Sequence, residues 1–297
     1  MERVVHLHSN ILTGSLFMPY APSNMIDYER YPIDQKGTLR DALLKRVRTD
    51  LERDGCAVIK QFLTSDGIAA LTAEADSVAD KGHRSFNRTN VYFSKDDPSL
   101  ADDDPRRQFF DRSNSFVPAD NFPKDGPLRV IHDSQGFDRF IQDCLQENEF
   151  YRYADPLADV IVNMAEEGNG FPWHFDTNNF TVTLAIQNAD QGGAFEYAPH
   201  IREGDENFAE VSRVLSGTSN KVKVLNLEPG DLQIFRGRYS LHRVAPLSGQ
   251  RRRYVAIFSY VGESNMVGTP ERTRQLYGRT LPIHHERAGL RSDSYLD

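Results

Sequence analysis

The sequence predicts an α+β fold in which β-strands dominate. Three observations support this: amphipathic helical patterns occupy the first half of the chain, short apolar strands begin near Tyr151, and glycine or proline turns separate those strands. The chain has 297 residues, 39% of them hydrophobic, so it can bury a sizeable core. We expect an N-terminal helical layer in front of an antiparallel barrel or double-sheet jelly roll.

The first half of the chain contains the predicted helices. Residues 1–38 are interrupted by prolines, so we expect a wrapping arm there. Apolar residues recur every four positions from Thr38 to Asp54, which predicts a helix that is capped by Thr38 and ends at Gly55. Residues 57–59 predict a short buried strand. Residues 65–79 predict a helix capped by Ser65, and residues 135–149 predict another.

Residues 82–127 fit neither a helical nor a strand period. Charged side chains alternate with aromatic ones, which predicts an irregular lid that packs on another part of the protein. The run Asp102-Asp103-Asp104 within it is typical of a solvated loop.

From Tyr151 the pattern is that of β-strands, predicted at residues 160–162, 180–186, 194–197, 222–225, 232–235 and 254–258. Turn signals such as Gly192-Gly193 and Pro229-Gly230 separate them. We therefore expect one domain over residues 1–297. It would comprise an arm (1–38), a helical layer and lid (39–149), a jelly-roll core (150–262) and a C-terminal tail (263–297).

Charge and composition exclude several classes of protein. The net charge of −8 argues against a nucleic-acid binder. No apolar run is long enough for a membrane span, and the N-terminus lacks the apolar stretch of a secretory signal, so we expect a cytoplasmic protein. The two cysteines, Cys56 and Cys144, lie in apolar segments, which argues against a disulfide framework and a thiolate metal site.

Two histidines and one aspartate form a candidate metal site. His174 and Asp176 lie two residues apart in an extended segment, so their side chains project to the same side. His242, at the start of a later strand, supplies a third ligand. Two histidines and one carboxylate that leave coordination positions open are the facial triad of non-haem Fe(II) oxygenases.

An arginine in the last predicted strand is a candidate anion ligand. Arg253 shares a strand face with Arg251, Val255 and Ile257, and a guanidinium among apolar side chains needs an anion to offset its burial. Its planar fork suits a carboxylate.

This arrangement resembles the Fe(II)/2-oxoglutarate-dependent dioxygenases, in which an H-x-D…H motif holds iron and a later arginine binds 2-oxoglutarate. The resemblance implies a double-stranded β-helix (jelly-roll, cupin-like) barrel, with Fe(II), 2-oxoglutarate and O₂ as cofactor and co-substrates. It assigns His174, Asp176 and His242 to iron, and Arg253 to the distal carboxylate of 2-oxoglutarate, with Arg251 as the alternative. Asn163 either contacts the other carboxylate, as in some members, or satisfies the backbone of a neighbouring strand.

The segments Trp173-His174-Phe175-Asp176, residues 192–199 and residues 229–232 look like the branch that includes free amino-acid hydroxylases and halogenases. The halogenases carry Gly or Ala in place of the carboxylate, whereas Asp176 is present here, so the resemblance favours hydroxylation. It implies succinate and CO₂ as co-products.

The expected substrate is a free amino acid or an amino-acid derivative, held by arginines near the mouth of the barrel. The candidates are Arg84, Arg88, Arg106, Arg107, Arg236 and Arg238. His200, His284 and His285 are rejected as metal ligands, the last two because they lie in a polar tail where solvation is expected. That tail either folds back over the barrel or forms a homodimer contact.

Two alternatives stay open. One keeps the chemistry but acts on a carrier-bound or natural-product intermediate, which the acidic net charge does not favour because carrier proteins are themselves acidic. The other is a metal- or ligand-binding barrel without turnover, in which the buried arginine and the clustered ligands would cost stability without use.

Overall fold

The protein folds into two facing antiparallel sheets, with helices covering the outer face of the larger one. The computed structural model describes residues 20–287, 295 and 296. The larger sheet follows the order β1-β11-β7-β14-β5-β3-β2, with β4 also paired to β14. Its strands are β1 (Cys56–Ile59), β2 (His83–Thr89), β3 (Phe110–Val117), β4 (Tyr151–Arg152), β5 (Val160–Ala165), β7 (Phe180–Gln187), β11 (Leu232–Phe235) and β14 (Arg253–Val261).

The smaller sheet faces it with the order β10-β9-β12-β6, and β13 pairs with β8 in a short ribbon. These strands are β6 (Phe171–His174), β8 (Gln191–Gly192), β9 (Phe195–Ala198), β10 (Lys223–Leu225), β12 (Leu241–Val244) and β13 (Leu247–Ser248). The jelly-roll prediction is confirmed, but the sheets do not close into a hydrogen-bonded barrel: β1, β2, β10 and β6 remain sheet edges. In a double-sheet jelly roll the apolar inner faces hold the two layers together.

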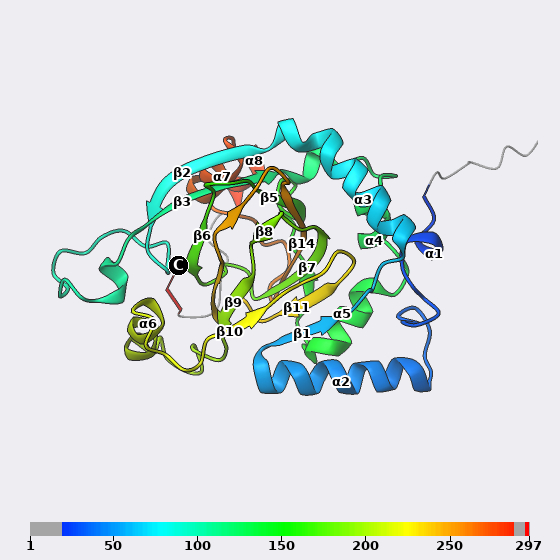
Figure 1. Ribbon diagram of the computed structural model, residues 1–297, viewed down its shortest axis with the longest axis horizontal. Helices are drawn as coiled ribbons and strands as arrows, with labels where there is room; N and C mark the ends of the chain where they lie inside the picture. Colours follow the sequence, from blue (N-terminus) through cyan, green and yellow to red (C-terminus); the bar gives the residue numbers. More distant parts are fainter. Residues whose placement is uncertain (1–19, 288–294, 297) are drawn as a thin grey trace, which may run out of the picture.

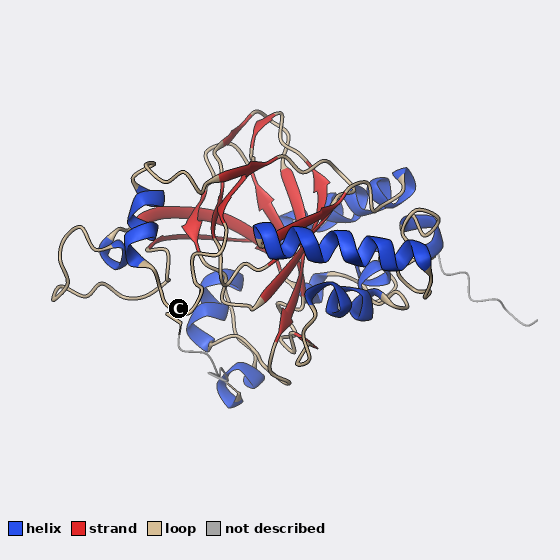
Figure 2. Cartoon of the chain, turned by 90° about the horizontal axis from the view of Figure 1, so that it is seen from below, coloured by secondary structure: helices blue, strands red, loops and turns tan. Residues whose placement is uncertain are grey.

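Four helices cover the larger sheet: α2 (Thr38–Asp54), α3 (Ser65–Val78), α4 (Pro127–His132) and α5 (Phe137–Leu145) (Figures 1 and 2). Their apolar faces join the sheet in the main core, where Leu51, Leu71 and Phe140 pack with Leu184 and Phe258. Burying such side chains contributes roughly 1.5–3 kcal/mol each. The core therefore fixes the sheet whose strands carry much of the site.

The predicted helix boundaries are nearly right, but both caps lie one residue earlier. Gly37 precedes α2 without a capping side chain, and Gly55 ends it in the left-handed region with φ 61°, as predicted. At α3 the Oγ1 atom of Thr64 accepts a hydrogen bond from Gly67 N at 3.0 Å. Thr64 is therefore the cap in place of Ser65, because its own backbone is extended while Ser65 is already helical.

The prediction of an irregular lid over residues 82–127 is wrong in part. β2 and β3 pair with each other, and β3 pairs with β5, which extends the larger sheet. Their polar composition hides the strand pattern, because β2 is an edge strand with an exposed face. The connecting residues 90–109 are a loop with a short 3₁₀ turn at Pro105–Arg107, and Asp102 and Asp103 are exposed as expected.

The C-terminal tail folds back onto the jelly roll. α7 (Pro270–Tyr277) packs against β2 and β3, and α8 (Pro282–Glu286) follows it (Figure 1). Two short helices complete the fold, α1 (Pro22–Met25) in the arm and α6 (Phe208–Leu215) beyond the smaller sheet.

Cys56 and Cys144 are buried free thiols. Within the described residues no helix has the length and apolar character needed to cross a membrane.

Candidate metal and substrate site

The two histidines and the aspartate predicted as metal ligands lie together between the sheets. His174 on β6 and His242 on β12 are register partners, with ring centroids 4.2 Å apart. Asp176 Oδ1 lies 3.6 Å from His174 Nε2 and 3.4 Å from His242 Nε2. All three ligand atoms lie within 4.8 Å of one another. Such an N₂O donor set fits Fe(II), since imidazole and carboxylate both suit this ion.

Backbone and hydroxyl groups orient each of these side chains. His174 Nδ1 donates to Pro172 O at 2.8 Å, and His242 Nδ1 donates to Ser240 O at 2.9 Å. Because a carbonyl oxygen can only accept, both rings carry their proton on Nδ1 and turn an unprotonated Nε2 toward Asp176. The hydroxyl of Thr181 donates to Asp176 Oδ2 at 2.6 Å, which leaves Oδ1 facing the histidines.

The charge states of these groups also suit a cation. Burial and the neighbouring His242 lower the pKa of His174 to about 3, so its ring is neutral near pH 7. Burial alone would raise the pKa of Asp176, but His242 and His174 lower it well below its usual value. Asp176 is therefore an anion beside the neutral imidazole of His174, and metal binding requires ligands in these protonation states.

Arg253 is buried and Arg251 is exposed. Arg253 begins β14 and is 6% exposed, whereas Arg251 lies in the preceding turn. Burial lowers the pKa of Arg253 to about 10. Among the described residues no carboxylate pairs with its guanidinium, which lies beside Gly193, where a Cβ would be 3.1 Å from Arg253 Cδ. The side chain is therefore a buried cation that can receive an anion.

Asn163 on β5 is buried opposite Val255 of β14. Its Nδ2 donates to Ser115 O on β3 at 3.3 Å. This bond is the one expected if Asn163 satisfies the backbone of a neighbouring strand.

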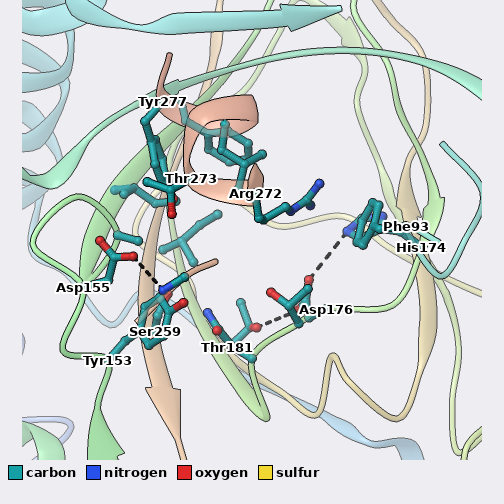
Figure 3. Close-up of a pocket in the computed structure, with 18 of the residues that line it drawn as sticks. Phe93, Tyr153, Asp155, His174, Asp176, Thr181, Ser259, Arg272, Thr273 and Tyr277 are labelled. Atoms are coloured by element: carbon teal, nitrogen blue, oxygen red, sulfur yellow. Dashed lines mark hydrogen bonds and ion pairs between the residues drawn. The ribbon is translucent and has the colours of Figure 1, made fainter. Parts of the chain in front are cut away.

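A cavity of about 110 Å³ opens beside Asp176. Figure 3 shows its walls: Phe93 and His174 on one side, Thr181 of β7 and Ser259 of β14 below, and side chains of α7 above. Ligand pockets for drug-sized molecules measure roughly 300–1,000 Å³, so this one suits a small molecule. The lining includes Phe93, Arg112, Phe171, Thr181, Ser259, Arg272 and Tyr277.

The six arginines predicted to hold the substrate do not line this cavity. Five of them bond to the surrounding protein: Arg84 pairs with Glu166, Arg88 with Asp111, Arg106 with Asp104, Arg107 with Asp96, and Arg236 with Glu147. Arg238 is buried, and its Nη1 donates to Asp176 O at 3.5 Å.

Two other arginines line the cavity, Arg112 of β3 and Arg272 of α7. The sequence pattern missed both because neither element was predicted. A period-2 reading of Arg112, Asn114 and Phe116, which are all buried, could have found the first.

The tail also differs from the prediction of a solvated segment. His284 is fully buried, and its Nε2 bonds to Asp155 Oδ1 at 3.0 Å, because α8 packs onto the jelly roll. His284 stays outside the metal cluster, as expected. Trp173, which precedes the first candidate ligand, is buried in the same apolar cluster as Phe175, and the guanidinium carbon of Arg243 lies 4.8 Å from the centroid of its ring. On β9, Tyr197 is buried, whereas Glu196 pairs with Arg243.

Comparison with known proteins identifies the family. A model of the Halogenase D family matches residues 39–277, most of the chain. The chain belongs to the Halogenase D family. A search of curated protein sequences finds no match.

Solved structures share the fold of this Halogenase D family member at low sequence identity. The α-ketoglutarate-dependent epimerase SnoN from nogalamycin biosynthesis is 14% identical with a TM-score of 0.53, over 74% of this chain and 81% of that one. The carbocyclase SnoK from the same biosynthesis is 13% identical with a TM-score of 0.53, over 76% and 87%. A prolyl hydroxylase from Trichoplax adhaerens is 16% identical with a TM-score of 0.49, over 77% and 95%.

The Halogenase D match and the clustered His-Asp-His set together place the protein among the Fe(II)/2-oxoglutarate-dependent oxygenases. It is an enzyme of that superfamily, whose cofactor and co-substrates are Fe(II), 2-oxoglutarate and O₂.

Proposed function

We propose that the protein hydroxylates a small polar molecule, a free amino acid or an amino-acid derivative, and converts 2-oxoglutarate to succinate and CO₂. His174, Asp176 and His242 hold Fe(II) in this proposal, and Arg253 binds the distal carboxylate of 2-oxoglutarate. The single observation that carries it is the convergence of the three ligand atoms, with Asp176 Oδ1 3.4–3.6 Å from both Nε2 atoms.

The residues around the iron ligands keep the site ready for the metal. Iron bound there would supply the activation of O₂. Pro172 O and Ser240 O hold both imidazoles in the tautomer that can coordinate through Nε2. Thr181 fixes the rotation of the Asp176 carboxylate, and the Asp176 backbone N–H donates to Gly237 O at 3.1 Å.

Arg253 suits the co-substrate because it is a buried cation; it lines a neighbouring cavity with Gly193 and Phe195, on the same face of β14 as residues of the cavity beside Asp176. Ile257 and Ser259, at alternate positions of β14 from Arg253, line the cavity beside Asp176. A carboxylate bound in two parallel hydrogen bonds would offset the desolvation of the guanidinium. Asn163 on the adjacent strand is the proposed lesser contact to the other carboxylate.

Asp176 is the reason to propose hydroxylation although the family is named for halogenases. The halogenases that the sequence resembles have Gly or Ala at this position, which leaves a coordination position for chloride. Here a carboxylate occupies it, held by Thr181 and facing both histidines. The oxidised substrate carbon would therefore receive hydroxyl.

The cavity volume supports a small free substrate over a carrier-bound one. At about 110 Å³ it accommodates few atoms besides those of a small metabolite.

The test is succinate formation from 2-oxoglutarate by the anaerobically reconstituted Fe(II) protein after exposure to O₂, with and without a panel of free amino acids. We expect at least one amino acid to stimulate succinate formation. Asp176→Ala should abolish it with an unchanged circular dichroism spectrum, whereas Asp102→Ala, at a fully exposed loop carboxylate, should retain it. Full activity in Asp176→Ala would remove the iron assignment.

A further inference from the structure

The cavity beside the iron ligands has a cationic wall. The guanidinium carbons of Arg112 and Arg272 lie 4.9 Å and 4.0 Å from the centroid of the Phe93 ring. Phe93 itself lies against His174, with ring centroids 5.7 Å apart. In Figure 3 Arg272 extends from α7 toward Phe93 and His174, across the cavity from Thr181. Two positive charges therefore lie next to the place where the metal would bind.

Arg112 has hydrogen-bonding capacity that the protein does not use. It is 3% exposed, and its Nε donates to Asn114 Oδ1 at 3.0 Å, but its buried Nη1 has no hydrogen-bond partner. No carboxylate within the described part of the chain forms an ion pair with it. A buried guanidinium without a counter-ion is costly unless a ligand supplies one.

The surroundings of Arg112 raise that cost. Its guanidinium stacks on Phe171 at 4.3 Å as well as on Phe93, and both rings are apolar. Burial, and after it the nearby Arg272, lower the pKa of Arg112 well below its usual value, while Asp176 acts in the opposite direction. An anion bound to Arg112 within the cavity would offset both effects.

The backbone at Phe93 indicates that this wall is built for a ligand. Phe93 has a φ of 59°, in the left-handed region that bulky residues rarely adopt. Such strain costs about 1–3 kcal/mol and concentrates at ligand sites. The strained backbone places the ring between the two arginines and His174.

The acidic side chains in the lining are already engaged. Asp176 belongs to the proposed metal site. Asp155 accepts from Leu157 N at 2.8 Å, Gly268 N at 2.9 Å and His284 at 3.0 Å. Among the described lining residues, a basic substrate side chain would therefore meet two guanidinium groups and no carboxylate that is available to pair with it.

We infer that Arg112, flanked by Arg272 across Phe93, forms a carboxylate-binding subsite, and that the substrate is a small dicarboxylic acid of the kind represented by acidic amino acids. One carboxylate binds Arg112 Nη1, and the second negative charge is favoured by Arg272. This inference rests on the proposed function for the chemistry, but the subsite is built from residues outside the metal and 2-oxoglutarate contacts.

Calorimetric titration tests the subsite without turnover. The protein is loaded anaerobically with Fe(II) and 2-oxoglutarate and titrated with L-aspartate, L-glutamate, their amides L-asparagine and L-glutamine, and L-lysine. The amides match the acids in shape but lack the second charge. We expect one acid to bind about tenfold or more tightly than its amide, as a charged hydrogen bond allows, and lysine to bind weakest.

Variants assign the effect to Arg112. Arg112→Ala should weaken binding of that acid by about tenfold or more and leave the Kd of 2-oxoglutarate within about twofold, while Arg112→Lys recovers part of the loss. Arg88→Ala, at an exposed arginine on the neighbouring strand, is the matched control and should bind as the wild type does.

Several outcomes would overturn the inference: equal binding of acid and amide, tightest binding of lysine, no binding of either acid, or an Arg112→Ala variant that loses only 2-oxoglutarate. Failure of the wild type to bind 2-oxoglutarate would instead remove the proposed function. In that case the titrations are repeated on the metal-free protein. Tighter binding of the acid than of its amide would still support the subsite, and equal binding would refute it. The comparison of acid and amide on the wild-type protein tests the subsite even if a variant does not fold.

Discussion

The position of the Asp176 carboxylate depends on a glycine that is distant in sequence. A Cβ atom on Gly237 would lie 1.9 Å from Asp176 Oδ2, a separation that no side chain tolerates. The absence of that atom lets the loop before β12 pass directly beside the carboxylate, while Thr181 holds the same oxygen by a hydrogen bond. Residue choice at 237 therefore controls the geometry of the candidate iron site as directly as the ligands do.

The two candidate ligands for 2-oxoglutarate, Arg253 and Arg251, differ in burial: the first is buried and the second is exposed. Arg253→Ala removes the buried cation, and we expect the KM for 2-oxoglutarate to rise roughly 10- to 100-fold, as loss of a charge-assisted bidentate contact allows. Arg251→Ala, at an exposed turn position, should change it less than about twofold. Steady-state kinetics at saturating substrate measure both. The reverse order would transfer the role to Arg251.

Among the elements, those with strong local patterns were predictable. The helix over Thr38–Asp54 and the strands near Val160, Phe180 and Leu232 follow from apolar periodicity, because their buried faces are nearly continuous. β2 and β3 were not predicted, since polar residues dominate them and their stability comes from pairing with β5.

The same distinction divides the candidate site. The candidate ligands His174 and Asp176 could be predicted because an H-x-D pair is local in sequence, whereas Arg112 and Arg272 come from β3 and α7, which only the tertiary fold brings together.

A buried carboxylate joins α3 to α4. Glu74 Oε2 accepts from Leu128 N in the first turn of α4 at 2.8 Å, while its buried Oε1 has no partner. Burial raises the pKa of Glu74 to about 7, although Leu128 N and Arg129 act against this shift.

The raised native pKa sets the sign of a pH effect. The favourable contribution of protonated Glu74 is complete below the unfolded pKa of about 4.5 and is lost as the pH rises through 7. Glu74→Gln should therefore stabilise the protein at pH 8 by on the order of 1 kcal/mol, with a gain that shrinks toward pH 5. Urea unfolding at both pH values measures this, with the exposed Glu52→Gln as control. A pH-independent difference would contradict the role given to Glu74.

α8 is attached to the jelly roll by the buried bond between His284 and Asp155. His284→Ala leaves the Asp155 carboxylate without its side-chain donor, and we expect a loss of about 2–3 kcal/mol in the free energy of unfolding. His285→Ala, at an exposed neighbour, should cost less than about 0.5 kcal/mol. Denaturant unfolding and the rate of proteolysis within residues 269–286 check both. Equal stability of the two variants would show that α8 is held by other contacts.

In the whole molecule, the helices that support the larger sheet lie on the opposite face of that sheet from the candidate site. Helices α2 to α5 cover one face of the larger sheet (Figures 1 and 2). The candidate site lies between the two sheets, and its cavity is lined by Phe93 of the loop at residues 90–109 and by side chains of α7. Ligands that bind there join elements distant in sequence, so binding should stabilise the whole fold.

A thermal shift tests this coupling. Under anaerobic conditions, Fe(II) and then 2-oxoglutarate are added at about 100 times their dissociation constants. Each ligand should raise the free energy of unfolding by at most about 2.7 kcal/mol, and a chelator should reverse the increase caused by iron. For 2-oxoglutarate the increase in Tm should be lost in Arg253→Ala and kept in Arg251→Ala. An iron-induced shift that persists in Asp176→Ala would place the metal elsewhere.

The position of α7 has a consequence for biosynthesis. A nascent chain that has emerged through Val261 already contains His174, Asp176, His242 and Arg253, whereas Arg272 and Tyr277, which wall the cavity, are translated later. Such a chain already has Arg112 and Phe93, but it lacks the wall that α7 contributes to the cavity. We therefore expect iron that is delivered before α7 is translated to give a site that holds substrate less tightly than the finished enzyme does.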